Sequence, residues 1–97
     1  MKVSFRDSRL DRLETNADEG ELSSVVVKAF RKRMAVIRAA ADERDFYALK
    51  SLHYEKLKGQ RQHQRSMKLN DQWRLILELD GDGPNRTVIV VAIEDYH

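Results

Sequence analysis

Hydrophobic and polar residues recur along this 97-residue chain with two different spacings. Up to about residue 41, apolar residues three or four apart predict helices. From residue 65 onward, apolar and polar residues alternate, as they do in strands. The order of these patterns predicts the succession β-α-α-β-β-β, which is an α+β fold with helices packed on an antiparallel sheet.

The first half of the chain contains a predicted strand and two predicted helices. Val3 to Phe5 alternates and indicates a brief edge strand, and a helix is expected from about Asp7. After a break, Asp18 and Glu21 have the spacing of a capping box. A long helix is then predicted by one apolar stripe, made of Leu22, Val26, Phe30, Met34, Ile37 and Ala41.

The second half predicts a short helix, a loop and three strands. Residues 42–57 are mixed, as in a short helix followed by irregular chain, and residues 59–64 are polar, as in a loop. Alternation then runs on both sides of a tight turn at residues 70–72, and a second turn is indicated at residues 80–85. The apolar run Val88 to Ile93 suits a central strand that is buried on both faces.

The two turns allow the register of the strands to be counted. Lys68 is expected roughly opposite Arg74, and Arg74 roughly opposite residues 92–94. One end of the sheet should therefore gather two cations with the C-terminal residues Asp95, Tyr96 and His97.

Composition limits the possible chemistry. A chain of 97 residues with 41% hydrophobic content supports one domain over residues 1–97. The absence of cysteine excludes disulfides, thiolate nucleophiles and cysteine-based zinc sites. Neither a membrane-spanning run nor a signal peptide is evident, so the expected location is cytoplasmic, with no membrane partner.

Although the net charge is only +2, cations cluster in two basic blocks, at residues 28–38 and 50–74. Clustered cations are the pattern expected of a protein that binds a polyanion such as RNA. The same blocks also fit a solvated helix face and a basic loop. The candidate RNA-binding residues are Lys28, Arg31, Lys32, Arg61, Arg65 and Lys68.

The residues gathered at the sheet end suit RNA cleavage. The reaction needs a base for the 2′-hydroxyl, an acid for the leaving 5′-oxygen, cations for the phosphate and a ring that stacks on a base. No metal or other cofactor is expected, because the RNA supplies its own nucleophile. Each residue also has a simpler interpretation: His97 as a frayed terminus, and Arg74 as an edge residue whose stem packs on the sheet. His53 and His63 are interpreted as surface residues rather than metal ligands.

Several motifs resemble one known family. Leu57-Lys58-Gly59, the block from Ser66 to Leu75 and the ending Glu94-Asp95-Tyr96-His97 resemble the plasmid-maintenance killer proteins, the HigB branch of the RelE toxin superfamily. The similarity extends to the opening residues 4–8 and to the order of elements. It implies a RelE-like fold, similar to that of microbial ribonucleases, and cleavage of mRNA in the ribosomal A site.

The resemblance also implies roles for individual residues. His97 and Asp95 match active-site positions, Tyr96 matches a ring that stacks on or supports the substrate, and Arg74 matches an arginine that contacts phosphate. Lys58 is the basic residue of the Leu-Lys-Gly motif. Some family members have a catalytic histidine two residues before the motif's leucine; here that position is Glu55, and His53 lies two residues earlier, so His53 is carried as a candidate.

Three functions follow as hypotheses. The first is the toxin of a type II toxin–antitoxin system, an endoribonuclease that cuts mRNA on the ribosome and arrests growth. Its expected partners are mRNA on the ribosome and a helix-turn-helix antitoxin of the HigA type, with operator DNA reached only through the antitoxin. The second is a non-catalytic RNA-binding or ribosome-binding module, and the third a corepressor that acts with its antitoxin. The terminal Asp95, Tyr96 and His97 favour the enzyme, since binding alone needs no acid–base group.

Overall fold

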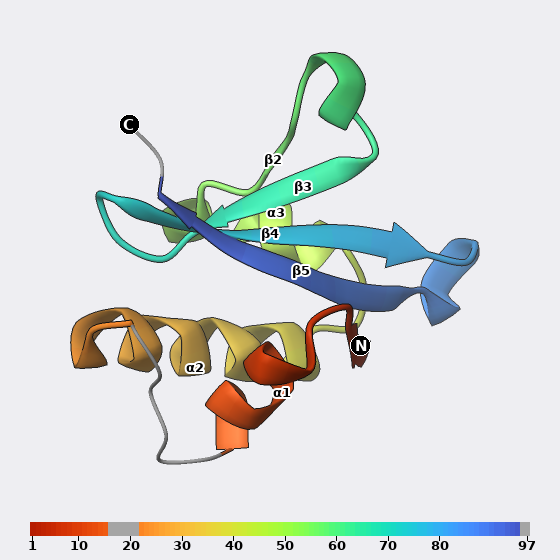
Figure 1. Cartoon of the computed structure of the whole chain (residues 1–97). Coiled ribbons are helices and arrows are strands. Elements are labelled where there is room, and N and C mark those ends of the chain that lie inside the picture. The colour runs from red at the N-terminus through yellow and green to blue at the C-terminus, as the bar shows by residue number, and fades with distance from the viewer. Residues whose placement is uncertain (16–21, 96–97) are drawn as a thin grey trace.

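Helices and sheet form separate layers in the computed structural model, which describes residues 1–15 and 22–95. In Figure 1, α1 and α2 lie beneath the sheet. The helical elements are α1 (Ser8–Thr15), α2 (Ser24–Ala39), α3 (Arg44–Ala48) and the short 3-10 turns η1 (Lys50–Leu52), η2 (Gly59–Arg61) and η3 (Gly83–Asn85). The strands are β1 (Lys2–Phe5), β2 (Glu55–Lys56), β3 (Gln64–Lys68), β4 (Trp73–Asp80) and β5 (Thr87–Asp95).

The five strands form one sheet in the order β1-β5-β4-β3-β2. The pairs β2–β3, β3–β4 and β4–β5 are antiparallel, whereas β1 runs parallel to β5. The α+β class and the edge position of β1 are confirmed, but the sheet is mixed. Alternation reports which side chains share a face and carries no information on strand direction, so the parallel pairing was not visible in the sequence.

The long helix α2 supplies much of the core. Ser23 is its N-cap, with its side chain accepting a hydrogen bond from the backbone N–H of Val26. The capping box expected at Asp18 and Glu21 lies outside the described residues. The predicted apolar stripe is buried from Val26 to Ile37, but the helix ends at Ala39, and Ala41 beyond it is exposed.

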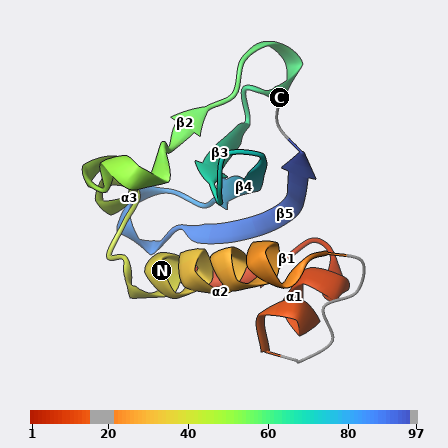
Figure 2. The same cartoon turned by 90° about the vertical axis from the view of Figure 1, so that its left-hand side faces the viewer.

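The central strand β5 differs from its predicted burial. Val88 and Val90 are fully buried against the helices, whereas Ile89 and Val91 are only half-buried, so the prediction of a strand buried on both faces is wrong. The ladder between β4 and β5 shifts register between Ile76 and Leu77, where Val91 is the extra residue of β5. The helices α1 and α2 lie on one side of the sheet, as Figure 2 shows from the side.

Both hairpin registers agree with the count from the turns. Lys68 pairs with Arg74 across β3 and β4, and Arg74 pairs with Glu94 across β4 and β5. The turn between β3 and β4 is fixed by Asn70, whose side-chain oxygen accepts hydrogen bonds from the backbone N–H groups of Gln72 and Trp73. The two-residue strand β2 was not predicted, because so short a segment has no readable alternation.

Within the described ranges, no helix has the length and apolarity needed to cross a membrane.

Candidate functional site

The candidate site lies on the sheet face turned away from the helices. Leu75 and Leu77 belong to the core beneath the sheet, so the alternate residues of β4, Arg74 and Glu78, lie on the opposite side. Ser66 of β3 shares this side, which we call the outer face. The outer face brings Arg74 together with its register partners Lys68 of β3 and Glu94 of β5.

Arg74 is a charged side chain that is nevertheless buried, and hydrogen bonds hold it in place. The residue is only 9% exposed. Its Nε donates to Ser66 Oγ at 3.0 Å, and its Nη2 donates to the backbone carbonyl of His53 at 2.6 Å. Glu55 Oε1 lies 3.6 Å from the same Nη2. An arginine restrained by several acceptors presents its charge in one orientation, which is what electrostatic stabilisation of a reacting phosphate requires.

The segment around His53 and Glu55 forms one wall of this site. His53 ends η1 in the left-handed conformation, with φ of 46°, and gives its carbonyl to Arg74, while its side chain is exposed. Glu55 follows at the start of β2, and its side chain is 53% exposed. A carboxylate that lies beside a fixed arginine and remains open to solvent can act as a proton acceptor for a bound substrate.

The turn between β3 and β4 adds further polar groups at the same end. Lys68 Nζ lies 3.1 Å from Asp71 Oδ1, and Gln72 Nε2 donates to Asp95 Oδ2 at 3.2 Å. Asp95 pairs with Trp73, so the alternation of β5 places it on the side opposite to Arg74, at the end of the strand. The predicted residues Tyr96 and His97 continue from there and lie outside the described residues.

Arg61 reaches the outer face from the connection between β2 and β3. Its Nη1 and Nη2 donate to the two carboxylate oxygens of Glu94, at 3.0 and 2.8 Å, and its Nε donates to Gln64 Oε1 at 2.9 Å. Glu94 is the register partner of Arg74. Lys58, directly before η2, is exposed and has no side-chain hydrogen bond at that helical turn.

Four predicted RNA-binding cations do not gather with Arg74. Arg65 Nε lies 3.3 Å from Glu43 Oε2, a carboxylate of the segment before α3. Arg31 Nε donates to the carbonyl of Leu13, which ties α2 to α1. Lys28 and Lys32 are exposed on α2, in the helix layer across the sheet from Arg74. Their proposed contacts with RNA are therefore separate from the cluster on the outer face.

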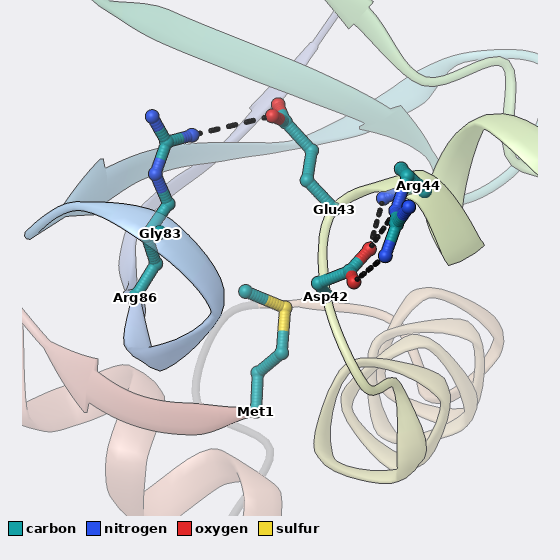
Figure 3. A pocket seen from close by; sticks show the side chains of 6 residues that line it. All are labelled: Met1, Asp42, Glu43, Arg44, Gly83 and Arg86. Carbon is teal, nitrogen blue, oxygen red and sulfur yellow. Dashed lines mark hydrogen bonds and ion pairs between the residues drawn. The ribbon is translucent and has the colours of Figure 1, made fainter.

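A hollow lies elsewhere in the molecule, and none of the predicted site residues lines it. It is an open cavity of about 400 Å³ lined by Met1, Asp42, Glu43, Arg44, Gly83 and Arg86. Figure 3 shows that its arginines face carboxylates: Arg44 pairs with Asp42, and Arg86 with Glu43. Glu43 also accepts the hydroxyl of Tyr54, and burial together with this bond raises the pKa of that phenol. The Arg86–Glu43 pair joins the chain after η3 to the segment before α3.

Metal ligands do not converge in the part of the chain that the structure describes: no three His, Asp or Glu side chains there are placed to hold one ion.

Three residues of the outer-face site were not among the candidates predicted from the sequence: Ser66, Glu55 and Glu94. Ser66 could have been placed beside Arg74 from the alternation in β3, since it lies two residues before Lys68. Glu55 stands where some family members have a catalytic histidine, and Glu94 was counted opposite Arg74, but their contacts could not be predicted, because these depend on the short strand β2 and on the fold of η2.

The sequence matches a family described as RelE-like toxin of type II toxin-antitoxin system HigB, over residues 3–97. The chain belongs to this HigB-like toxin family. Its role is therefore that of the toxin in a type II toxin–antitoxin pair, and this role implies an antitoxin as partner. The recognition made from the Leu-Lys-Gly motif and the C-terminal residues is thereby confirmed.

Solved structures show the same fold. A YoeB/ParE toxin from Agrobacterium tumefaciens is similar to the HigB-like chain with a TM-score of 0.62 and 16% sequence identity, and the alignment covers 100% of both chains. The expected RelE-like fold is thus confirmed. No curated protein sequence matches the chain.

Proposed function

We propose that this HigB-like toxin, acting as one domain over residues 1–97, is an endoribonuclease that cuts mRNA on the ribosome. The observation that carries the proposal is the fixed position of Arg74, bonded to Ser66 and to the His53 carbonyl beside the exposed carboxylate of Glu55. Binding of RNA alone does not require a buried cation beside a proton acceptor. The two groups together suit acid–base catalysis at a phosphodiester.

The proposed reaction uses the RNA 2′-hydroxyl as its nucleophile. The hydroxyl loses its proton to a base and attacks the adjacent phosphorus, and the bond to the leaving 5′-oxygen breaks as an acid protonates that oxygen. Arg74 stabilises the negative charge of the pentavalent phosphate, and Lys58 and Lys68 hold neighbouring phosphates. The acid and the base come from the group formed by His53, Glu55 and His97. Tyr96 stacks on a base of the substrate.

The remaining cations suit a large polyanionic surface. Lys28 and Lys32 are exposed on α2, away from Arg74, where they can contact ribosomal RNA while the outer face engages the message. Since the proposed substrate is a translated message, the site of action is the cytoplasm. The proposed antitoxin is a helix-turn-helix protein of the HigA type, and operator DNA is bound through it.

The test uses purified protein, ribosomes and one defined message. The toxin should cut the message only when it is on the ribosome, because positioning of the 2′-hydroxyl in line with the leaving oxygen contributes much of the rate. The upstream fragments should end in a 2′,3′-cyclic phosphate. Glu55→Gln should bind ribosomes as wild type does and cut more slowly. Ribosome binding without any cleavage by wild type would contradict the proposal and support a non-catalytic module.

A further inference from the structure

All three guanidinium nitrogens of Arg61 donate hydrogen bonds to other side chains of the protein. Nη1 and Nη2 face the two oxygens of Glu94, and Nε faces Gln64. This two-point arrangement of an arginine on a carboxylate is the geometry with which arginine also binds a phosphate group. We propose that Arg61, whose guanidinium is oriented by Gln64, binds a phosphate of the RNA backbone and that Glu94 masks it until RNA arrives. The inference rests on the function proposed above.

The position of Glu94 connects this site to the reaction. In the ladder between β4 and β5, Glu94 stands directly opposite Arg74. Because Arg61 is bonded to Glu94, its guanidinium lies beside the residue that faces Arg74 across the ladder. A strand whose reacting phosphate lies at Arg74 can therefore bring a neighbouring phosphate to Arg61. The carboxylate of Glu94 repels that phosphate until the phosphate replaces it on Arg61.

The exchange requires little free energy. The side chains of Arg61 and Glu94 are 46% and 36% exposed, so solvent screens their attraction, and water can hydrate Glu94 after it leaves. The ion pair of Arg74 differs in this respect, because the Arg74 side chain is only 11% exposed. Arg61 is thus a cation of the outer face that can change partners, while Arg74 keeps its orientation.

The masking predicts a specific dependence on salt. In wild type, a phosphate that displaces Glu94 neutralises Arg61 but leaves a carboxylate that attracts a cation from solution, so the net release of counterions at this site is close to zero. In Glu94→Gln, Arg61 is a free charge before binding. Binding of a single strand should then show a slope of log K against log salt that is steeper by about 0.7, the value for one additional phosphate contact.

The experiment is a double-mutant cycle on RNA binding. Wild type, Glu94→Gln, Arg61→Gln and the double variant are titrated with a fluorescent single-stranded RNA whose 2′-hydroxyls are methylated, so that no cleavage can occur. Anisotropy is read at several salt concentrations. Asp80→Asn, which removes one exposed carboxylate at the far end of β4, measures the general effect of charge. Thermal unfolding of each variant reports whether it is folded.

The expected result is that Glu94→Gln tightens binding by roughly two- to fivefold, the factor that corresponds to an exposed ion pair. In the Arg61→Gln background, the same change should tighten binding no more than Asp80→Asn does. Equal tightening in both backgrounds would overturn the inference, as would the absence of RNA binding by every folded variant. Cleavage of mRNA on the ribosome is measured separately, so the proposed function can stand if the masking fails.

Discussion

At the scale of single residues, the guanidinium of Arg74 has both a structural role and a proposed catalytic role. It satisfies the buried hydroxyl of Ser66 and the carbonyl of His53, and it carries the charge proposed to stabilise the reacting phosphate. Its position at the sheet end could be predicted, because turn residues set the register of both hairpins. Its burial could not, because the chain that covers it belongs to η1 and β2, whose two to three residues leave no pattern in the sequence.

Arg74→Ala should therefore affect both stability and activity. Removing the guanidinium leaves the Ser66 hydroxyl and the His53 carbonyl without their donor, which costs about 1 to 3 kcal/mol. The matched control is Arg44→Ala, whose side chain is 90% exposed and which should leave stability nearly unchanged. Urea unfolding measures both variants. A loss of activity in Arg74→Ala with unchanged stability would mean that its buried hydrogen bonds contribute nothing to the fold.

At the scale of elements, α2 is tied to the strand that carries Lys68. Arg33 Nε donates to the backbone carbonyl of Lys68 at 2.7 Å, and partial burial lowers the pKa of this arginine. The helix itself and the two hairpins were predictable from periodicity and turn residues. The cross-connection was not, because the basic block at residues 28–38 looks uniform in the sequence. The fold separates that block into cations that are bonded inside the molecule and lysines that are exposed.

Arg33→Ala should consequently loosen the end of β3. The loss of a hydrogen bond from a charged donor to a partly buried carbonyl should lower the free energy of unfolding by about 1 to 2 kcal/mol. Its neighbour Lys32 is exposed, so Lys32→Ala serves as the control and should change that free energy by less than about 0.5 kcal/mol. Hydrogen exchange of the amides in residues 67–73 should accelerate only in Arg33→Ala. Equal effects of the two substitutions would refute the proposed connection.

At the scale of the whole molecule, ion pairs join segments far apart in the chain. Glu78 in β4 accepts both terminal nitrogens of Arg6, just after β1, at 2.7 Å each, and also a hydrogen bond from Gln64. The bonds from Arg6, and then from Gln64, lower the pKa of Glu78 from 4.5 to about 2. Charge totals in the sequence could not reveal such pairs, because each depends on which strands the fold places side by side.

The lowered pKa of Glu78 makes a prediction about acid stability. A carboxyl group whose pKa is depressed in the folded state stabilises the fold above its unfolded value, near 4.5, and loses that contribution as pH falls towards about 2. The stability difference between wild type and Glu78→Gln should therefore be full at pH 6 and shrink between pH 4.5 and 2. Arg6→Gln removes the main cause of the shift and should weaken the same pH dependence. Urea unfolding at several pH values is the measurement, and a difference that does not vary with pH would contradict this assignment.

The central claim, that this HigB-like toxin cuts mRNA during translation, is tested most directly by mapping mRNA 5′ ends in a bacterium in which the chain is induced without its antitoxin. We expect new 5′ ends within the coding regions of translated messages, together with growth arrest. His97→Ala at equal expression should produce neither, because an acid or base contributes about a hundred- to ten-thousand-fold in rate. Growth arrest by wild type without new 5′ ends, or His97→Ala as toxic as the parent, would contradict the account.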